Sequence, residues 1–285
     1  MDETSTVKTV LITGCSSGIG FCLAHGLRSA GYRVFATARK EKDITKLNEL
    51  GFDAFLLDLA SSSSIKAAIS KLYQKTDSLY ALINNGAYGQ AGALEDISRE
   101  ALEKQFQVNV FGWHELTNLV LPSMKERNIG RVVYISSVLG FVAMPFRGPY
   151  VASKFAIEGL VDTLRLELKQ TKIKLSLVQP GPIESKFRQN AFLAFKENVD
   201  PSNSDYKREY KAMIERLNSD KNIQFTLPPD SVLRCVLHAL ESKTPKNHYR
   251  VTFPTKLFAI LCRILPSSWM DNILTRVDKG DNTDG

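Results

Sequence analysis

The chain has 285 residues, of which 44% are hydrophobic and 24% are charged. This composition is typical of a globular protein, and the length fits one large α/β domain. The 37 basic and 30 acidic residues give a formal net charge of +7. Because the basic residues are scattered and form no block, the sequence excludes a basic nucleic-acid-binding arm, and we expect no nucleic-acid partner.

Cysteine usage and the N-terminus bear on the compartment of the protein. The four cysteines include no CxxC pair and no histidine spacing that suits zinc, so we expect reduced thiols and no metal site. The N-terminus starts with acidic and polar residues, and nowhere do about eighteen apolar residues follow one another. We therefore expect no signal peptide and no ordinary transmembrane helix, which favours a cytoplasmic protein.

Short β-rich runs alternate with longer helical stretches over the first two thirds of the chain. The strand candidates are almost continuously apolar, as strands covered on both faces are. The alternation predicts a single domain, residues 1–285, with a Rossmann-type doubly wound parallel sheet and helices on both faces. The expected strands are Val7–Ile12, Arg33–Thr37, Ala54–Leu57, Leu79–Ile83, Arg131–Ile135 and Leu175–Val178, and the expected helices are Ile19–Ser29, Ser62–Lys75, Glu100–Arg127 and Tyr150–Gln170.

The pattern changes after residue 183. Residues 184–227 are charged and rich in Asn and Ser, with weak helical periodicity only at Tyr206–Leu217, so we expect an irregular excursion over the sheet. Regularity returns over residues 228–276, where Pro228-Pro229-Asp230 starts a helix at Ser231–Leu240 and a short strand is expected at His248–Thr252.

An apolar helix bounded by prolines is expected at Phe253–Pro266. It is too short to span a membrane, so it can lie on a membrane, cover a pocket or form an oligomer contact. Packing within the protein or the oligomer is the favoured interpretation. We expect residues 277–285 to form a disordered tail.

A glycine-rich loop, Thr13-Gly14-Cys15-Ser16-Ser17-Gly18-Ile19-Gly20, follows the first strand and opens a helix. Its glycines let the backbone approach a pyrophosphate, and the helix N-terminus offers unpaired N–H groups to the negative charge. A tight turn that binds nothing is the alternative, but the flanking strand and helix favour a nucleotide.

The spacing TGxxxGIG resembles the cofactor motif of the short-chain dehydrogenase/reductase family. The resemblance extends over most of the chain and implies that residues 7–183 form the cofactor-binding and catalytic core, with residues 184–227 as a substrate loop. It also implies a dinucleotide site made of Gly14, Ser16, Ser17, Gly18, Ile19, Gly20, Arg39, Asp58, Leu59, Asn85, Gly86, Ala87, Pro180, Gly181, Ile183 and Ser185.

The end of the second strand indicates which cofactor is used. An acidic residue there would bind a ribose 2′-hydroxyl and repel a 2′-phosphate, but the sequence has Arg39, with Ser17 as a hydroxyl partner. The guanidinium fork suits a phosphate, so we expect NADP(H). A surface charge at a strand end is the alternative for Arg39. Asp58 matches the family aspartate that contacts adenine, and it can also cap the following helix.

Two segments differ slightly from the family pattern. Asn84-Asn85-Gly86-Ala87 resembles NNAG with Gly and Ala exchanged, and the small residues still permit close approach of the adenine ribose. Gln179-Pro180-Gly181-Pro182-Ile183-Glu184-Ser185 resembles the PGxxxT segment that holds the nicotinamide carboxamide, with Ser185 in place of threonine. A proline-stiffened turn is the alternative interpretation of the second segment.

A catalytic group is predicted around Tyr150-Val151-Ala152-Ser153-Lys154. Tyr150 and Lys154 share one helix face, Ser137 ends the fifth strand, and Asn109 lies in the preceding helix. This Asn, Ser, Tyr, Lys set matches the family in order and spacing. Ser136 is the rival for the serine role, and the spacing favours Ser137.

The resemblance implies a role for each member. Tyr150 is the general acid/base, Lys154 lowers the pKa of its phenol, Ser137 holds the substrate oxygen, and Asn109 holds a water that links Lys154 to solvent. The implied reaction is hydride transfer between nicotinamide and a carbonyl or alcohol carbon. A non-catalytic NADP(H)-sensing protein on the same fold is the alternative.

Substrate and assembly follow from the same resemblance. The motifs look most like the 17β-hydroxysteroid and retinol dehydrogenase branch and bacterial aldehyde reductases, which implies an apolar carbonyl or alcohol substrate and a homodimer or homotetramer. Apolar residues in loops near the expected nicotinamide site suit a hydrophobic pocket, although ordinary core packing is an equal alternative. They are Phe141, Val142, Met144, Phe146, Phe187, Phe192 and Phe195.

Overall fold

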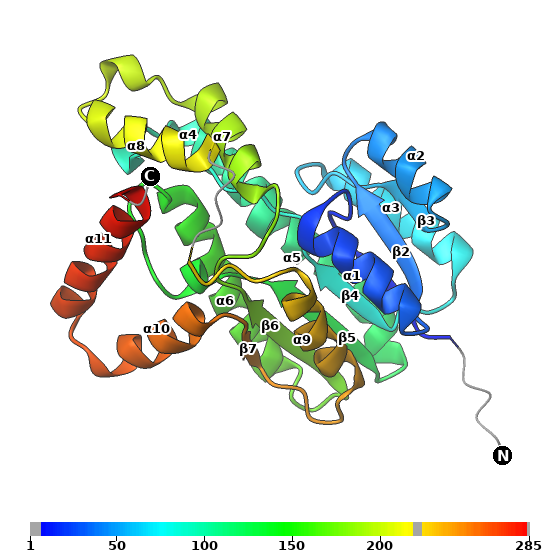
Figure 1. Ribbon diagram of the computed structural model, residues 1–285. Helices are drawn as coiled ribbons and strands as arrows, with labels where there is room; N and C mark the ends of the chain where they lie inside the picture. The colour runs from blue at the N-terminus through cyan, green and yellow to red at the C-terminus, as the bar shows by residue number, and fades with distance from the viewer. Residues whose placement is uncertain (1–6, 219–223, 284–285) are drawn as a thin grey trace.

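A seven-stranded parallel sheet forms the centre of the molecule in the computed structural model, which describes residues 7–218 and 224–283. The strand order is β3-β2-β1-β4-β5-β6-β7, so the order reverses between β1 and β4. Figure 1 shows the strands between helical layers, and the doubly wound Rossmann-type fold is confirmed. The strands are β1 Thr9–Ile12, β2 Arg33–Ala38, β3 Asp53–Leu56, β4 Ala81–Asn84, β5 Gly130–Ile135, β6 Ile173–Gln179 and β7 His248–Arg250.

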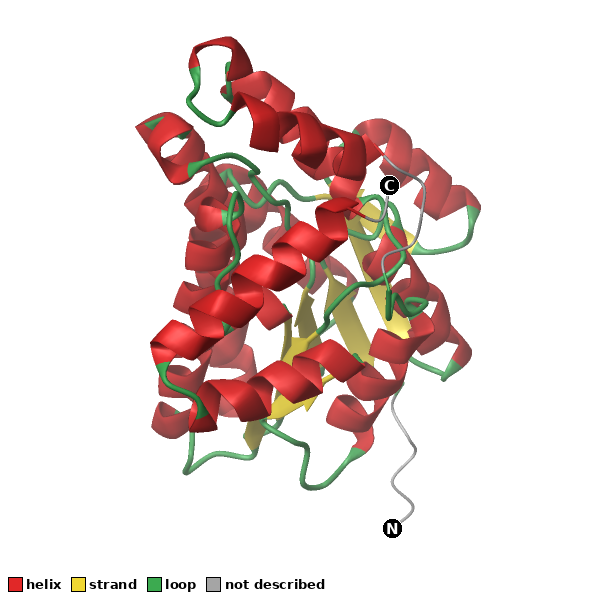
Figure 2. Ribbon diagram, turned by 60° about the vertical axis from the view of Figure 1, so that its left-hand side comes forward, coloured by secondary structure: helices red, strands yellow, loops and turns green. Residues whose placement is uncertain are grey.

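The two faces of the sheet carry separate cores. One core packs α3 (Ser62–Lys75), α5 (Gly112–Glu126) and α6 (Gly148–Glu167) on the sheet. The other packs α1 (Gly18–Ser29), α2 (Glu41–Glu49) and α9 (Asp230–Glu241) on the opposite face. Figure 2 shows the sheet enclosed by both layers, as its near-continuous apolar strands require.

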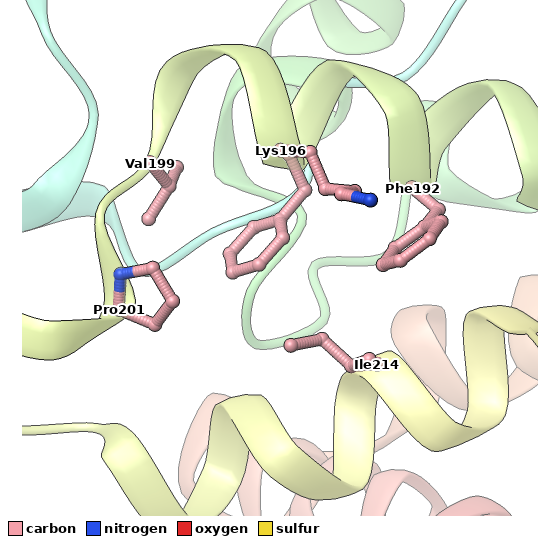
Figure 3. Close-up of a pocket in the computed structure, with 6 residues that line it drawn as sticks. Phe192, Lys196, Val199, Pro201 and Ile214 are labelled. Carbon is pink, nitrogen blue, oxygen red and sulfur yellow. The ribbon is translucent and has the colours of Figure 1, made fainter.

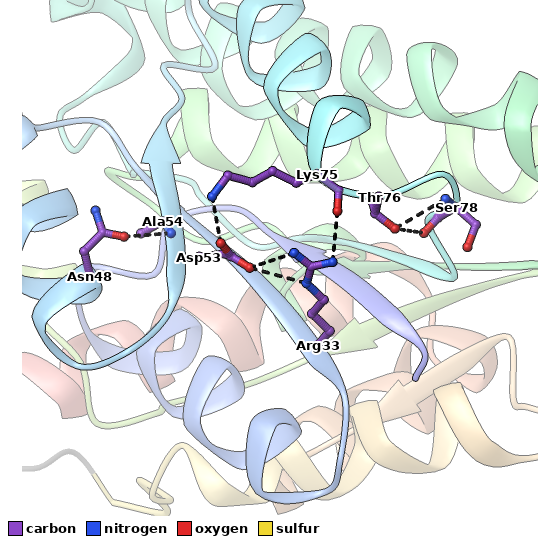
Figure 4. Close-up of polar contacts among 7 residues, drawn as sticks. All are labelled: Arg33, Asn48, Asp53, Ala54, Lys75, Thr76 and Ser78. Carbon is purple, nitrogen blue, oxygen red and sulfur yellow. Dashed lines mark hydrogen bonds and ion pairs between the residues drawn. The ribbon is translucent and has the colours of Figure 1, made fainter. Parts of the chain in front are cut away.

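Helix α2 is absent from the sequence-based expectation. Only Ile44 and Leu47 are buried in it, and most of its other residues are charged or polar. Its apolar periodicity is therefore too short to be recognised in the sequence. Next to it, Asp53 on β3 joins two basic residues, with distances of 3.1 Å to Arg33 and 2.7 Å to Lys75 (Figure 4). This exposed ion pair network fastens the outer strands to α3.

The expected long helix at 100–127 is divided into three parts. It begins as α4 (Arg99–Phe106), passes through a π-helical turn, η2 (Gln107–Phe111), and continues as α5. A π-turn inserts an extra residue into the helical ladder, and such turns are frequent at functional sites. Asn109 lies in this turn.

The region after residue 183 is more helical than expected. Residues 187–198 form α7 (Phe187–Asn198), where the sequence predicts an irregular excursion, and α8 (Lys207–Asn218) coincides with the weak periodicity. After β7 the chain forms α10 (Phe253–Ile264) and α11 (Ser267–Thr283).

The expected disordered tail is wrong up to Thr283, because α11 packs Met270 and Leu274 against α10 and continues through this stretch. Residues 284–285 lie outside the described residues. Within the described ranges, no helix combines the length and apolarity needed to cross a bilayer.

Candidate active site

The glycine-rich loop connects β1 to α1 at the switch point of the sheet, where the carboxyl ends of parallel strands form a crevice. Gly14 and Gly18 have φ values of 72° and 55°, which favour glycine. A Cβ atom on Gly20 would lie 2.2 Å from the Gly14 carbonyl oxygen. The loop therefore needs glycine at these positions and keeps the backbone open to a phosphate group, so the residues fit a dinucleotide.

Thr13 and Asn85 hold this loop against the end of β4. The Asn85 amide donates to the Thr13 carbonyl oxygen at 2.8 Å, and Thr13 Oγ1 accepts from the backbone N–H groups of Asn85 and Gly86 at 2.9 and 2.8 Å. Gly86 also passes close to Gly14, where a Cβ on Gly14 would lie 2.6 Å from Gly86 Cα. With glycine at 86 and alanine at 87, in the reverse order of the family pattern, the segment keeps a tight backbone contact between Gly86 and Gly14.

The ends of β2 and β3 carry the expected adenosine contacts. Arg39 and Ser16 are exposed beside the loop, and Ser17 is the N-cap residue of α1, where its hydroxyl makes no capping bond. Asp58 accepts from the Ala60 N–H at 3.0 Å. Helix α3 is capped by Ser61 rather than Asp58, so the simple helix-cap alternative for Asp58 is wrong.

Leu59 lines the same end of the crevice. A Cβ on Gly86 would lie 3.2 Å from a methyl group of Leu59. The Leu59 side chain is buried against the core, so it fixes this wall of the crevice by packing.

The segment after β6 closes the opposite side of the crevice. The Val138 N–H donates to the Pro180 carbonyl oxygen at 2.8 Å, which joins this segment to the end of β5. Gly181 packs so tightly on Thr252 that a Cβ would lie 2.2 Å from its hydroxyl oxygen.

Ile183 and Ser185 continue this closing segment. Ile183 pairs with Leu227, and a Cβ on Gly18 would be 3.0 Å from Ser185 Cβ. Ser185 thus faces the glycine loop, and Ile19 is the second residue of α1, which begins at Gly18.

Tyr150 and Lys154 lie on the first turns of α6, facing the end of β5. Tyr150 is 9% exposed, and Lys154 is 1% exposed with its ammonium donating to the Ile135 carbonyl oxygen at 2.9 Å. The same ammonium lies 4.1 Å from the centroid of the Trp113 ring. The Trp113 indole donates to the Gly86 carbonyl oxygen at 2.8 Å, so one buried residue links Lys154 to the cofactor crevice.

Burial dominates the ionisation of this pair. It raises the pKa of Tyr150 to about 12, while a hydrogen bond with Ser137 lowers it. Burial lowers the pKa of Lys154 to about 7, and the charge of Glu158 acts in the opposite direction. Burial thus dominates both pKa values, and the Lys154 ammonium donates to Ile135, so a phenol pKa lowered by Lys154 stays a prediction for the cofactor-bound enzyme.

The two candidate serines point to different partners. Ser137 lies next to Tyr150, close enough to lower the pKa of its phenol, and accepts from the Leu139 N–H at 3.1 Å. Ser136 lies beside Gly140 and Glu158, where a Cβ on Gly140 would be 2.7 Å from the Ser136 hydroxyl and 2.8 Å from a Glu158 carboxylate oxygen. Of the two, Ser137 has the position that can hold a substrate oxygen beside Tyr150.

Asn109 is connected to Tyr150 by hydrogen bonds that pass through Ser153. Its amide donates to the Tyr88 carbonyl oxygen at 2.9 Å and to Ser153 Oγ at 3.1 Å. Ser153 in turn donates to the Tyr150 carbonyl oxygen at 2.7 Å. Asn109 thus joins the π-helical turn to the first turns of α6 through Ser153.

A buried carboxylate lies one turn beyond Lys154 on α6. Glu158 accepts from the Gln179 amide at 2.9 Å and lies 3.6 Å from His248 Nε2. Burial raises its pKa to about 7. The sequence motifs did not identify Glu158 as a site residue. Its spacing of four residues from Lys154 does predict that the two side chains share one face of the helix.

Phe187, the first residue of α7, covers Tyr150. The ring centroids are 5.1 Å apart, and a Cβ on Gly89 would lie 2.7 Å from the Phe187 ring. Among the described ring contacts, Phe187 is therefore the one residue of the expected apolar set that contacts Tyr150 directly.

The rest of the apolar set packs elsewhere. Phe141, Val142 and Met144 pack on α10 and α11. Phe146, Phe192 and Phe195 belong to the cluster of α7 and α8. Between α7 and α8 an apolar hollow of about 300 Å³ is lined by residues that include Phe192, Lys196 and Ile214 (Figure 3).

Comparison with known proteins places this geometry in a family. The model of the short chain dehydrogenase family matches residues 8–194. The chain is 42% identical to the Uncharacterized oxidoreductase YbbO of Escherichia coli K12 over 94% of both chains, and 37% identical to human retinol dehydrogenase 8 over 84% of this chain and 79% of that protein.

A solved structure agrees in fold. The crystal structure of a short chain dehydrogenase/reductase from Burkholderia phymatum in complex with NAD has a TM-score of 0.76 and 21% identity, and it covers 91% of this chain and 93% of the other. The family model covers more than half of the chain, and the relatives named above are more than 30% identical over most of it. The chain therefore belongs to the short-chain dehydrogenase/reductase family of oxidoreductases.

Proposed function

We propose that the chain is an NADP(H)-dependent oxidoreductase that interconverts an apolar aldehyde or ketone, of aliphatic, steroid or retinoid type, and the corresponding alcohol. The observation that carries this proposal is the position of Tyr150 beside Ser137 and Lys154 at the edge of the glycine-lined crevice. The nicotinamide would supply or accept the hydride.

In carbonyl reduction, Ser137 holds the substrate oxygen and Tyr150 donates its proton to that oxygen. In alcohol oxidation, Tyr150 removes the hydroxyl proton. Lys154 orients the tyrosine and passes protons through water held at Asn109. Burial keeps the Tyr150 phenol protonated at neutral pH, so the residue carries the proton that carbonyl reduction requires.

The cofactor preference rests on Arg39, whose guanidinium is exposed beside the glycine loop with no acidic residue at the end of β2. The apolar substrate class rests on Phe187 over Tyr150 and on the similarity to retinol dehydrogenase 8. We further propose a homodimer or homotetramer in the cytoplasm, in keeping with four free cysteines.

A turnover panel tests the proposal. NADPH absorbance is followed with apolar aldehydes and ketones for the wild type, Tyr150→Phe and Tyr73→Phe. Tyr73 is the matched control, because its hydroxyl lies in the core on α3 without a partner among the described residues. We expect turnover by the wild type and Tyr73→Phe and a loss of about 10²–10⁴-fold in Tyr150→Phe. NADPH binding without turnover of any substrate would instead favour the sensing protein.

A further inference from the structure

An apolar stripe runs along the outside of α10. Phe253, Leu257, Ile260 and Ile264 are 60%, 40%, 57% and 67% exposed. Their spacing of four, three and four residues places all of them on one face of the helix. Four large apolar side chains in a row on a surface are a feature that ordinary scattered exposure does not explain.

The opposite face of α10 is occupied by the protein itself. Phe258 and Ala259 are 7% and 5% exposed, and Phe258 packs with Val142 and with Met270 of α11. The helix is therefore fixed in place by one face while the other points outward. Internal packing, which the sequence favours, accounts for only half of its apolar residues.

Two further exposed aromatic residues lie close to the stripe, Phe225 in space and Trp269 in the sequence, five residues after Ile264. Trp269, at the start of α11, is 62% exposed. Phe225 is 48% exposed, and its ring centroid lies 5.5 Å from that of Phe253. We call these six residues the α10 surface. Figure 1 shows α10 and α11 at the periphery of the molecule, beyond β7.

Charge completes the pattern. Lys256 and Arg263 are exposed on α10, two turns apart along one side of the stripe, and α10 has no acidic residue. On α11, Asp271 and Arg276 are both exposed and offset one another. The α10 surface therefore combines apolar anchors with excess positive charge.

We infer that the α10 surface binds the interface of a membrane that contains anionic lipids. A helix with a broad apolar face, flanking Lys or Arg and a tryptophan nearby lies in the plane of the headgroups, with its apolar side chains in the acyl boundary. Basic residues near an anionic surface add electrostatic attraction. The inference does not depend on the proposed function.

A second copy of the chain fits this surface less well. In a two-fold dimer the same patch meets itself, so Lys256 and Arg263 would approach a patch whose helix carries basic and no acidic residues. An anionic bilayer complements both residues at once. Self-association is therefore an outcome that the test must separate from lipid binding.

Vesicle binding by the full chain tests the inference. Co-sedimentation is measured with phosphatidylcholine vesicles with and without phosphatidylglycerol, and tryptophan emission is recorded in parallel. Trp113 is fully buried, so a blue shift on vesicle addition reports on Trp269. We expect binding to the anionic vesicles, weakened by salt, with a blue shift of the emission.

Two double variants examine the two parts of the surface. Ile260→Gln with Ile264→Gln removes apolar anchors and should weaken vesicle binding about tenfold or more. Lys256→Gln with Arg263→Gln should weaken binding to anionic vesicles about tenfold or more. The control is Leu50→Gln with Ile129→Gln, at exposed apolar positions of other elements, 38% and 42% exposed, and it should bind like the wild type.

Specific results would overturn the inference. One is failure of the folded wild type to bind anionic vesicles. Another is unchanged binding in the Ile260→Gln, Ile264→Gln variant with a native circular dichroism spectrum. A third is a dimer that this variant converts to a monomer while no vesicle binding occurs, which would assign the surface to a second copy.

Discussion

The first 183 residues and the remainder of the chain are built in different ways. In the first region, buried strands are clamped between two helical layers, and the strands β1 and β4 are buried throughout. In the second region, β7 and α9 complete the sheet and one of its helical layers, whereas α7, α8, α10 and α11 pack in small clusters outside that unit and leave large apolar side chains exposed. The comparison teaches that the chemistry resides in the rigid part, while cover and surface contacts reside in the added helices.

The largest expected effect is the loss of NADPH binding on substitution in the glycine loop, which belongs to the first region. Gly20→Ala places a Cβ 2.2 Å from backbone, so we expect loss of detectable NADPH binding and a lower Tm. Gly159→Ala is the matched control, since nothing lies within 4 Å of its Cβ, and it should gain about 0.5–1 kcal/mol of stability. NADPH binding by Gly20→Ala with native affinity would show that the loop does not receive the phosphates.

The second prediction concerns cofactor choice. Arg39→Asp should weaken NADPH binding about 10–100-fold, corresponding to about 1.5–3 kcal/mol for hydrogen bonds to a charged group, and should improve NADH binding. Lys46→Asp makes the same charge change near the far end of α2 and should alter neither affinity much. Fluorescence titration measures both. Equal affinities of the wild type for the two cofactors would count against Arg39.

The contact between the two regions gives a smaller effect. Phe187→Ala removes the ring of α7 that covers Tyr150, so we expect a KM for an apolar substrate raised about 2–10-fold. Because burial raises the Tyr150 pKa, opening the site should move the basic limb of the kcat profile to lower pH. Phe192→Ala, on the same helix but away from Tyr150, is the control. Identical kinetics for Phe187→Ala and the wild type would remove α7 from the site.

The last prediction concerns folding rather than turnover, and it is a pH dependence of stability. The pKa of Glu158 is raised by burial, so its protonated form favours the folded state, and this stabilisation is complete below about pH 4.5 and lost as pH rises through about 7. His248, whose pKa is lowered by burial, acts in the opposite direction. We therefore compare unfolding free energies of the wild type and Glu158→Gln between pH 5 and 7. The wild type should lose about 1–3 kcal/mol more than the variant, and parallel curves would refute the assignment.

The sequence predicted the first region well for physical reasons. Parallel strands that are covered on both faces must be apolar along their whole length, and this pattern is visible without neighbours. Asn109, Ser137, Tyr150 and Lys154 were predicted because their order and spacing resemble the short-chain dehydrogenase/reductase family. The structure brings Ser137, Tyr150 and Lys154 together as expected.

The added helices were harder to predict. Helix α7 buries only Ala191, Ala194 and Phe195, so its helical periodicity is weak. The stacking of Phe187 on Tyr150 joins segments that are distant in sequence, and no local pattern encodes it. The exposure of Ile260 and Ile264 depends on which face of α10 the rest of the chain covers. The π-turn at Asn109 also has no sequence signal that distinguishes it from an ordinary helix.

The most direct test of the central claim measures NADPH binding and turnover on one preparation of Tyr150→Phe. The phenol hydroxyl lies outside the glycine loop, so we expect NADPH affinity within about threefold of the wild type, less than the 1.4 kcal/mol of a tenfold change. Turnover of the best apolar carbonyl substrate should fall by about 10²–10⁴-fold. Unchanged turnover with intact NADPH binding would contradict the assignment of Tyr150 as the acid/base.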